Sequence, residues 1–459
     1  MHATLLAAVV LAAAPRIHCV SDISHEFTFY MDGRFFNQYV GEAGGADVRN
    51  WGTLWKLDLA NANLLALSSG SGPVAYDPRT VAHVRKFAEG GGAALIMADR
   101  SGLPAATKLP IADVAAAFGA GFAAEKAEPP LRAEAKLGAE KVEFYGGGTL
   151  ELKPGWEPLV TDARGKPVLA RRGVGKGCVL VGIRGLFGNR PDASDPINSQ
   201  WVRPLLQDAV KGKAVDAGKP FQGQSAELTK KLGALTVEYH EGTKQFADAI
   251  AKEYFIVREH LVKITGVPPS PGTLTNLLML PTGGGGFSSG DRIGIGAWWG
   301  DFPKNRYPMI ELIGHEAAHS WVLPYAEPVW NEPIATYLGI QVGKAMGMPE
   351  AQKTLEGAVE RARRDDPEMR KVDIGAPGAP NAAVWGKTFW IFEQIRAKHG
   401  DDAMAKYFQA KRRLLKPGRK GYSLDDCVAV WSAAVGEDLF PWFRSLGISV
   451  DRTKADVGG

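Results

Sequence analysis

Two histidines and a glutamate stand at fixed spacing within an apolar, helix-like stretch of the sequence. His315 and His319 are four residues apart, and Glu316 directly follows the first of them. On an α-helix this spacing places both imidazoles on one face, one turn apart. Two such histidines can share a tetrahedral Zn²⁺, and the neighbouring glutamate can take a proton from a water molecule that the metal activates. The pattern His-Glu-x-x-His therefore predicts a zinc site with Glu316 as the general base.

A hydrolytic zinc site needs three protein ligands and one open position. Downstream of His319 there are two candidates, Glu327 in a loop beside Pro328 and Glu332 near the start of a second helical segment. We favour Glu332, because a helix start can aim its carboxylate back at the first helix. The predicted cofactor is thus one Zn²⁺ held by His315, His319 and Glu332, with Glu327 as the other candidate.

The segments around these residues indicate a mixed but mostly helical second half. Apolar periodicity predicts strands and helices in the following order: a strand at 235–240, a helix at 243–265, a strand at 276–280 and helices from 308 to 446. We assign this region, residues 225–450, to an α+β domain, followed by a tail at 451–459.

The first half has a different pattern. A buried strand at 61–69 is followed by a helix at 78–89, which Asp77 caps and Pro78 begins, and then by a second apolar strand at 93–98. Strand, helix and apolar strand form a βαβ unit, which predicts an α/β domain with a parallel sheet. We place this domain at 21–213. The polar Gly- and Pro-containing segment 214–224 is the predicted linker.

The bulk composition excludes some classes of protein. The chain has 459 residues, 45% hydrophobic and 23% charged, which is typical of a globular protein of two or three domains. A formal charge of +4 is too small to indicate nucleic-acid binding. The apolar run Leu5–Ala14 is too short to span a membrane and is typical of a secretory signal, so segment 1–20 predicts export to the periplasm or the exterior. No other segment predicts a membrane span.

The zinc motif and its surroundings resemble the gluzincins of the Peptidase MA clan, in particular the aminopeptidase-N-like peptidases. Trp330-x-Glu332-Pro-x-Ala-x-Tyr337 follows the motif as W-x-N-E-G-x-A does in that family. The resemblance covers residues 225–450 and implies a thermolysin-like fold, a zinc peptidase activity and a peptide or protein substrate. It also implies that Gly294–Gly300 is the substrate-binding edge strand. The substrate-binding residues expected from the resemblance are Gly296, Ala297, Trp298 and Trp385.

The sequence departs from the family pattern in three places. The gap between His319 and Glu332 is shorter than usual. No glutamate stands in Gly-Ala-Trp-Trp, where aminopeptidases of this family bind the free amino group of the substrate. No tyrosine stands at or just before Trp385, where the family has its transition-state tyrosine. The tyrosines that remain as candidates for this role are Tyr307, Tyr325, Tyr337 and Tyr407.

The first half resembles the glutamine-amidotransferase-like fold, through its βαβ unit and the strand pattern Val174–Gly182. The nucleophile of that family would follow the strand that ends near Ala98, but Asp99-Arg100-Ser101 stands there. We therefore expect a non-catalytic domain.

The favoured function is a zinc-dependent metallopeptidase, and two alternatives remain open at this stage. One is an endopeptidase directed at glycosylated or cell-surface proteins, which would resemble the enhancin-like gluzincins. The other is a binding or scaffold protein that holds a structural zinc without turnover.

Overall fold

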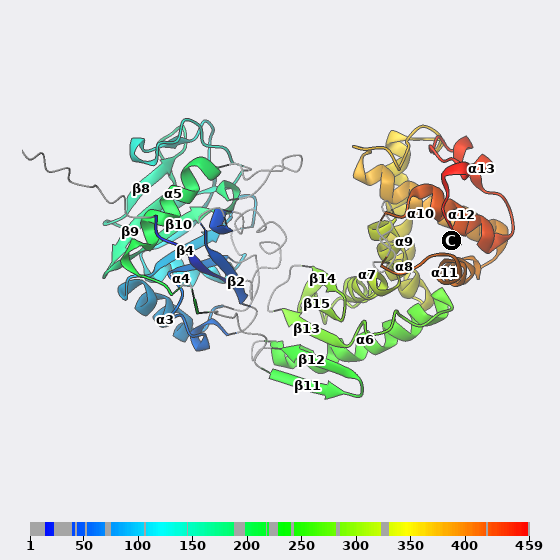
Figure 1. Ribbon diagram of the computed structural model, residues 1–459, viewed down its shortest axis with the longest axis horizontal. Helices are drawn as coiled ribbons and strands as arrows, with labels where there is room; N and C mark the ends of the chain where they lie inside the picture. Colours follow the sequence, from blue (N-terminus) through cyan, green and yellow to red (C-terminus); the bar gives the residue numbers. More distant parts are fainter. Residues whose placement is uncertain are drawn as a thin grey trace, which may run out of the picture. The chain divides into compact units, whose positions relative to one another are not determined.

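The structure is a computed structural model of the 459-residue chain. It describes residues 14–22, 39–41, 44–50, 53–68, 75–104, 107–144, 146–187, 198–216, 218–219, 228–239, 243–280, 285–322, 330–418 and 421–457. Glu327, Tyr325, most of the predicted signal segment and much of the predicted linker lie outside these residues. The chain divides into two compact units, residues 1–227 and 228–459, which are described separately (Figure 1).

The first unit is built on an eight-stranded sheet in the order β2-β1-β3-β4-β10-β9-β8-β6, beside a two-stranded sheet of β5 and β7. Its strands are β1 (His18–Asp22), β2 (Ala46–Asn50), β3 (Leu64–Ser68), β4 (Ala93–Ala98), β5 (Ala120–Lys126), β6 (Arg132–Ala133), β7 (Gly148–Leu152), β8 (Glu157–Thr161), β9 (Pro167–Val174) and β10 (Gly177–Ile183). Its α-helices are α3 (Pro78–Glu89), α4 (Ile111–Ala117) and α5 (Ser199–Ala209).

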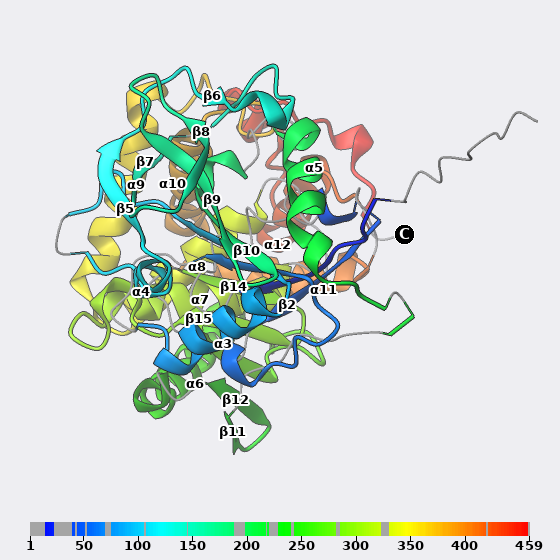
Figure 2. The same ribbon diagram turned by 90° about the vertical axis from the view of Figure 1, so that its left-hand side faces the viewer.

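Both faces of this sheet are buried, which explains why its central strands are apolar throughout. In β3, Leu65 and Leu67 pack in one core with residues of α3 and α4, whereas Leu64 and Ala66 pack in another core with residues of α5. Figure 2 shows α3 and α5 on either side of the strand β10.

The βαβ unit predicted from the sequence is confirmed. Strands β3 and β4 pair in parallel, and α3 connects them. The side chain of Asp77 accepts a hydrogen bond from the backbone N–H of Arg79, and Pro78 is the first residue of α3. An amidotransferase-like assignment for the whole unit stays a prediction.

The second unit has a five-stranded sheet in the order β11-β12-β13-β15-β14 and is otherwise mostly helical. Its strands are β11 (Leu228–Leu232), β12 (Leu235–Tyr239), β13 (Asn276–Leu280), β14 (Gly286–Ser289) and β15 (Arg292–Gly296). Its α-helices are α6 (Lys244–Thr265), α7 (Tyr307–Val322), α8 (Asn331–Ala345), α9 (Pro349–Asp365), α10 (Asn381–His399), α11 (Ala403–Leu414), α12 (Leu424–Val435) and α13 (Phe440–Ser445). Across the described ranges of both units, no helix has the length and apolarity needed to cross a membrane.

The layout of an α/β region followed by a largely helical region is as predicted, but the expected edge strand is wrong. Residues 292–296 form β15, which lies inside the sheet between β13 and β14. The edge strand is β14, which pairs antiparallel with β15. A two-residue turn connects them, and its first residue, Gly290, has a φ of +61°, which glycine adopts at little cost. Because of this hairpin, the edge of the sheet is β14 and not β15, where the sequence predicted it.

Helices α7 and α8 pack closely at two glycines. A Cβ atom on Gly314 would lie 2.7 Å from the Cα atom of Gly339, and a Cβ atom on Gly339 would lie 2.6 Å from the carbonyl oxygen of Glu311. Neither distance leaves room for a side chain, so the two backbones touch directly. Figure 1 shows the two helices side by side. This crossing brings the start of α8 to the histidines of α7.

A buried ion pair fixes the helices behind the site. The ammonium group of Lys387 on α10 donates to Asp366 Oδ2 at 2.8 Å, to the carbonyl oxygen of Val372 at 2.6 Å and to that of Leu446 at 2.7 Å. The Asp366 carboxylate also accepts from the backbone N–H groups of residues 370, 371 and 372. Both side chains are fully buried, at 0% and 1% exposure.

This arrangement predicts a dependence of stability on pH. Burial alone would raise the pKa of Asp366, but the Lys387 ammonium and the three backbone N–H groups outweigh it and lower the pKa to about 2. Because the carboxylate binds its proton more weakly in the folded chain than in the unfolded one, it stabilises the fold above its ordinary pKa, and this contribution falls away between about pH 4 and pH 2. Urea unfolding should show that Asp366→Asn is less stable than the wild type above about pH 5 and that the difference shrinks below pH 4. An equal difference at every pH would contradict this.

Candidate metal centre

The two histidines of the motif lie on the same face of α7, as their spacing requires. Their Nε2 atoms are 3.2 Å apart, and their rings meet edge to face with centroids 4.8 Å apart. His319 is buried and His315 is half-buried. The helix around them is apolar and packs in the core of the second unit. The polar motif is therefore held on a rigid, buried element.

Glu332 reaches this pair from α8. It stands in the first turn of that helix, and its carboxylate oxygens lie 3.3 Å from Nε2 of His315 and 3.7 Å from Nε2 of His319. The side chain is half exposed, at 52%. The structure thus brings together the three residues that the sequence suggested as ligands. The other candidate, Glu327, lies outside the described residues.

The donor atoms fit a tetrahedral zinc ion. With metal–nitrogen bonds of 2.0–2.1 Å, two ligand atoms on a tetrahedral zinc are about 3.3 Å apart. The two Nε2 atoms are 3.2 Å apart, and Nε2 of His315 is 3.3 Å from Oε2 of Glu332, both close to this value. The other oxygen of Glu332, Oε1, is 3.7 Å from Nε2 of His319. Nδ1 of His319 faces the amide oxygen of Asn331 at 3.2 Å, so Nδ1 carries the proton and Nε2 presents a lone pair.

The outer partners of the histidines were missed in the sequence. Nδ1 of His315 lies 2.9 Å from the hydroxyl oxygen of Thr336, one helical turn after Glu332, and Asn331 stands directly before Glu332. Such partners fix the tautomer and the orientation of the rings. The signal was present in the spacing, because Glu332 and Thr336 are four residues apart on one helix and share a face.

This contact gives a prediction for Thr336. Thr336→Val keeps the shape of the side chain but removes the oxygen that His315 faces, so the affinity for zinc should fall by about 10–100-fold. Thr336→Ser, which keeps the hydroxyl, serves as the control and should stay close to the wild type. Competition with a chromophoric chelator measures both. Equal affinities of the Val and Ser variants would mean that the hydroxyl does not orient His315.

Glu316 lies beside the histidines and is 5% exposed. One carboxylate oxygen and one nitrogen from each histidine all lie within 4.8 Å of one another. The carboxylate oxygens of Glu332 lie 3.3 Å and 3.7 Å from the two histidines, which is shorter than this 4.8 Å limit. We therefore assign the third ligand position to Glu332 and not to Glu316. Burial, opposed by the charge on His315, raises the pKa of Glu316 to about 7.

The electrostatics of the three ligands agree with a cation site. A hydrogen bond with His315 lowers the pKa of Glu332 below its ordinary value, so this carboxylate is ionised at neutral pH. Burial and repulsion by His315 lower the pKa of His319 to about 4, which keeps its ring neutral. Burial opposes a charge on His315, but a hydrogen bond with Glu332 and the charges of Glu316, Glu332 and Glu311 outweigh it and raise its pKa. The anionic Glu332 carboxylate and the neutral His319 ring therefore stand beside His315, whose raised pKa favours a positive charge on its ring.

The residues expected to bind substrate make their contacts with other parts of the second unit and not with the three proposed ligands. Ala297 is fully buried, and its N–H donates to the carbonyl oxygen of Leu280, so it belongs to the core. Gly296 ends the interior strand β15 and its N–H donates to the carbonyl oxygen of Gly285. Trp298 packs against Phe246 with ring centroids 6.0 Å apart. The ring of Trp385 meets that of Phe389 edge to face, with centroids 6.3 Å apart. None of these contacts involves a ligand residue.

The candidate tyrosines are mostly core residues. The hydroxyl of Tyr337 donates to Glu393 at 2.7 Å, and Tyr407 stacks on Trp431 at 4.3 Å. Tyr307 is buried at the start of α7. Tyr325 lies outside the described residues. The structure therefore assigns no described tyrosine to the transition state.

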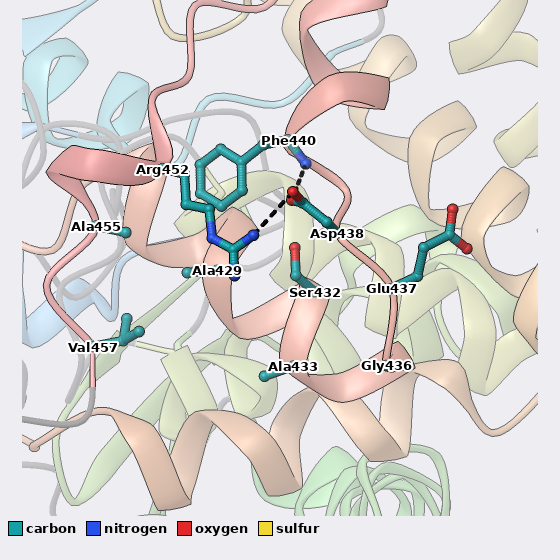
Figure 3. A pocket seen from close by; sticks show the side chains of 10 residues that line it. All are labelled: Ala429, Ser432, Ala433, Gly436, Glu437, Asp438, Phe440, Arg452, Ala455 and Val457. Atoms are coloured by element: carbon teal, nitrogen blue, oxygen red, sulfur yellow. Dashed lines mark hydrogen bonds and ion pairs between the residues drawn. The ribbon is translucent and has the colours of Figure 1, made fainter.

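A separate cavity of about 470 Å³ lies near the end of the second unit (Figure 3). It is lined by residues of α12 and of the segment after it, including Ser432, Asp438 and Arg452. Arg452 and Asp438 form an ion pair of 3.0 Å across it. No residue of the metal centre lines this cavity, so it is a different feature.

Comparison with known proteins gives no family assignment. No protein-family model matches the sequence. No curated protein matches it either. Solved structures give distant likenesses. The mmIFT52 N-terminal domain is 14% identical with a TM-score of 0.33, over 42% of this chain and 97% of that one. An exo-beta-1,4-mannosidase of an Opitutaceae bacterium is 18% identical with a TM-score of 0.26, over 37% of this chain and 31% of that one.

A third likeness is to an M1 zinc metallopeptidase of Deinococcus radiodurans, solved as a mutant bound to a Tyr-Ser-Ala substrate. It is 15% identical with a TM-score of 0.33, over 49% of this chain and 51% of that one. This chain thus spans about half the length of that metallopeptidase. At these TM-scores none of the three likenesses establishes a shared fold. What the chain does must be argued from its own site.

Proposed function

We propose that this protein is a zinc-dependent metallopeptidase. The observation that carries the proposal is the convergence of Nε2 of His315, Nε2 of His319 and the Glu332 carboxylate at 3.2–3.7 Å, with the buried Glu316 beside them. Three ligands with one open position are typical of hydrolytic zinc sites, whereas structural zinc sites are closed by four protein ligands.

The residues divide the chemistry between them. His315, His319 and Glu332 would hold the ion, which when bound acts as a Lewis acid and lowers the pKa of water. Glu316 takes the proton of the attacking water on its carboxylate and later gives it to the leaving amine.

The edge strand β14 offers a place for the peptide. It lies against α7, and its outer side has no partner strand among the described residues. An extended peptide can pair with such an edge through backbone hydrogen bonds, which tolerate many side chains. We propose that the substrate pairs with β14 and so passes close to Glu316.

An endopeptidase is the form of this activity that the edge strand favours. The segment 281–290, Pro-Thr-Gly-Gly-Gly-Gly-Phe-Ser-Ser-Gly, contains no carboxylate that could pair with a free α-amine. Cleavage of N-acetylated and free peptides of one sequence at equal rates would support this form. Strict dependence on a free amine would contradict it. The sequence also leaves a non-catalytic zinc protein open, and such a protein would bind zinc in the wild type without hydrolysing any peptide.

The decisive first measurement is zinc content. Wild-type protein that has been offered zinc and then dialysed should hold about one ion per chain, and Glu332→Ala should hold much less, because two neutral histidines alone bind weakly. Glu327→Ala is the matched control and should keep its zinc. Folded wild-type protein without zinc would refute the proposal. Full zinc in Glu332→Ala would keep the metal site but move the third ligand.

Export, proposed from segment 1–20, is tested by finding the protein outside the cytoplasm.

A further inference from the structure

The strand β14 presents a glycine to the proposed general base. A Cβ atom on Gly286 would lie 2.9 Å from both Cγ and Oε1 of Glu316, and 2.7 Å from the carbonyl oxygen of Gly294. Non-bonded heavy atoms prefer about 3.5–4.0 Å, so a side chain does not fit while Glu316 keeps its position. The φ of Gly286 is outside the left-handed region, so the backbone conformation alone does not require glycine here.

The neighbouring residue provides the comparison. A Cβ atom on Gly285 would meet no atom within 4 Å. The run of glycines is therefore not uniformly constrained, and the constraint lies at the position that faces Glu316.

The Glu316 side chain is 5% exposed, so the atoms around it restrict where its carboxylate can lie. The backbone of β14 is one of these surroundings, because β14 packs against α7 and Gly286 lies next to Glu316.

We propose that Gly286 is a positioning residue, whose missing side chain leaves the space from which the Glu316 carboxylate faces the two histidines. The role in catalysis rests on the proposed function, but the contact itself can be tested without it.

The contact is tested by a double-mutant cycle in protein treated with a chelator. Wild type, Gly286→Ala, Glu316→Ala and the double variant are compared by thermal unfolding. Gly286→Ala should lower the unfolding midpoint by roughly 2 °C or more beyond its effect in the Glu316→Ala background, because the smaller side chain removes part of the clash. Gly285→Ala, the matched control, should have the same effect in both backgrounds. An equal cost of Gly286→Ala in both backgrounds would overturn the proposal.

The positioning role is tested in zinc-loaded protein. Gly286→Ala should lower kcat by at least about tenfold, with zinc content close to the wild type, because the three ligands remain while the base is displaced. Unchanged kcat, or a loss confined to KM, would overturn the role. If the wild type hydrolyses no peptide, the proposed function fails, and the unfolding cycle still decides whether Gly286 places Glu316.

Discussion

Glu316→Gln is expected to lower kcat for peptide hydrolysis by about 10²–10⁴-fold while one zinc ion per chain is retained. Glutamine has nearly the same shape but cannot accept the proton of the attacking water. The three proposed ligands are unchanged, so binding of the metal should not depend on the substitution. Initial rates with a quenched fluorescent peptide, together with elemental analysis of the same preparation, measure both quantities.

Glu311→Gln is the matched control for this experiment. Glu311 lies on the same helix one turn before His315, and it is also largely buried, which raises its pKa. Its replacement makes the same chemical change next to the site but away from the proposed proton transfer, so kcat should fall much less. Undiminished activity of Glu316→Gln would show that Glu316 is not the base. Zinc binding without peptide hydrolysis in the wild type would favour a scaffold protein.

Lys387→Met is expected to lower the free energy of unfolding by about 3–5 kcal/mol, the usual cost of removing one partner from a buried ion pair. The substitution leaves the Asp366 carboxylate without its cation and the carbonyl oxygens of Val372 and Leu446 without their donor. Methionine fills a similar volume, so the loss comes from charge and hydrogen bonding and not from a cavity. Chemical unfolding followed by tryptophan fluorescence measures the change.

Lys406→Met on α11 is the control for this loss. Lys406 forms an exposed pair with Asp402 four residues earlier, and such pairs contribute about 0.3–0.5 kcal/mol. A change below about 1 kcal/mol for Lys387→Met would mean that the buried pair contributes little more than a surface pair.

The sequence predicted the elements that have strong periodicity. The helix of the histidine motif, the capped helix α3 and the apolar strands β3, β4 and β13 stand where the pattern indicated, since their residues repeat at 3.6 or run apolar between turns. The choice between Glu332 and Glu327 was also made on local grounds, from the position of Glu332 at a helix start.

The elements that were missed carry weak local signals. Strand β14 consists of Gly286, Phe287, Ser288 and Ser289, with neither an apolar run nor alternation, and only the Gly290-Asp291 turn marks it. The partner of His315 depends on how α7 and α8 cross, which no single helix determines. The expected edge strand was wrong because the resemblance placed the sheet edge at β15, which lies inside the sheet, and the substrate contact expected at Ala297 stays a prediction.

The glycine crossing of α7 and α8 has a consequence for how this protein can change over evolution. Since Gly314 and Gly339 bring main chain against main chain, the spacing between the two helices is set by atoms that every amino acid shares. Substitutions elsewhere in the core can alter its packing without moving Glu332 away from the histidines. The two glycines therefore hold the three proposed ligands in place through the main chain of α7 and α8.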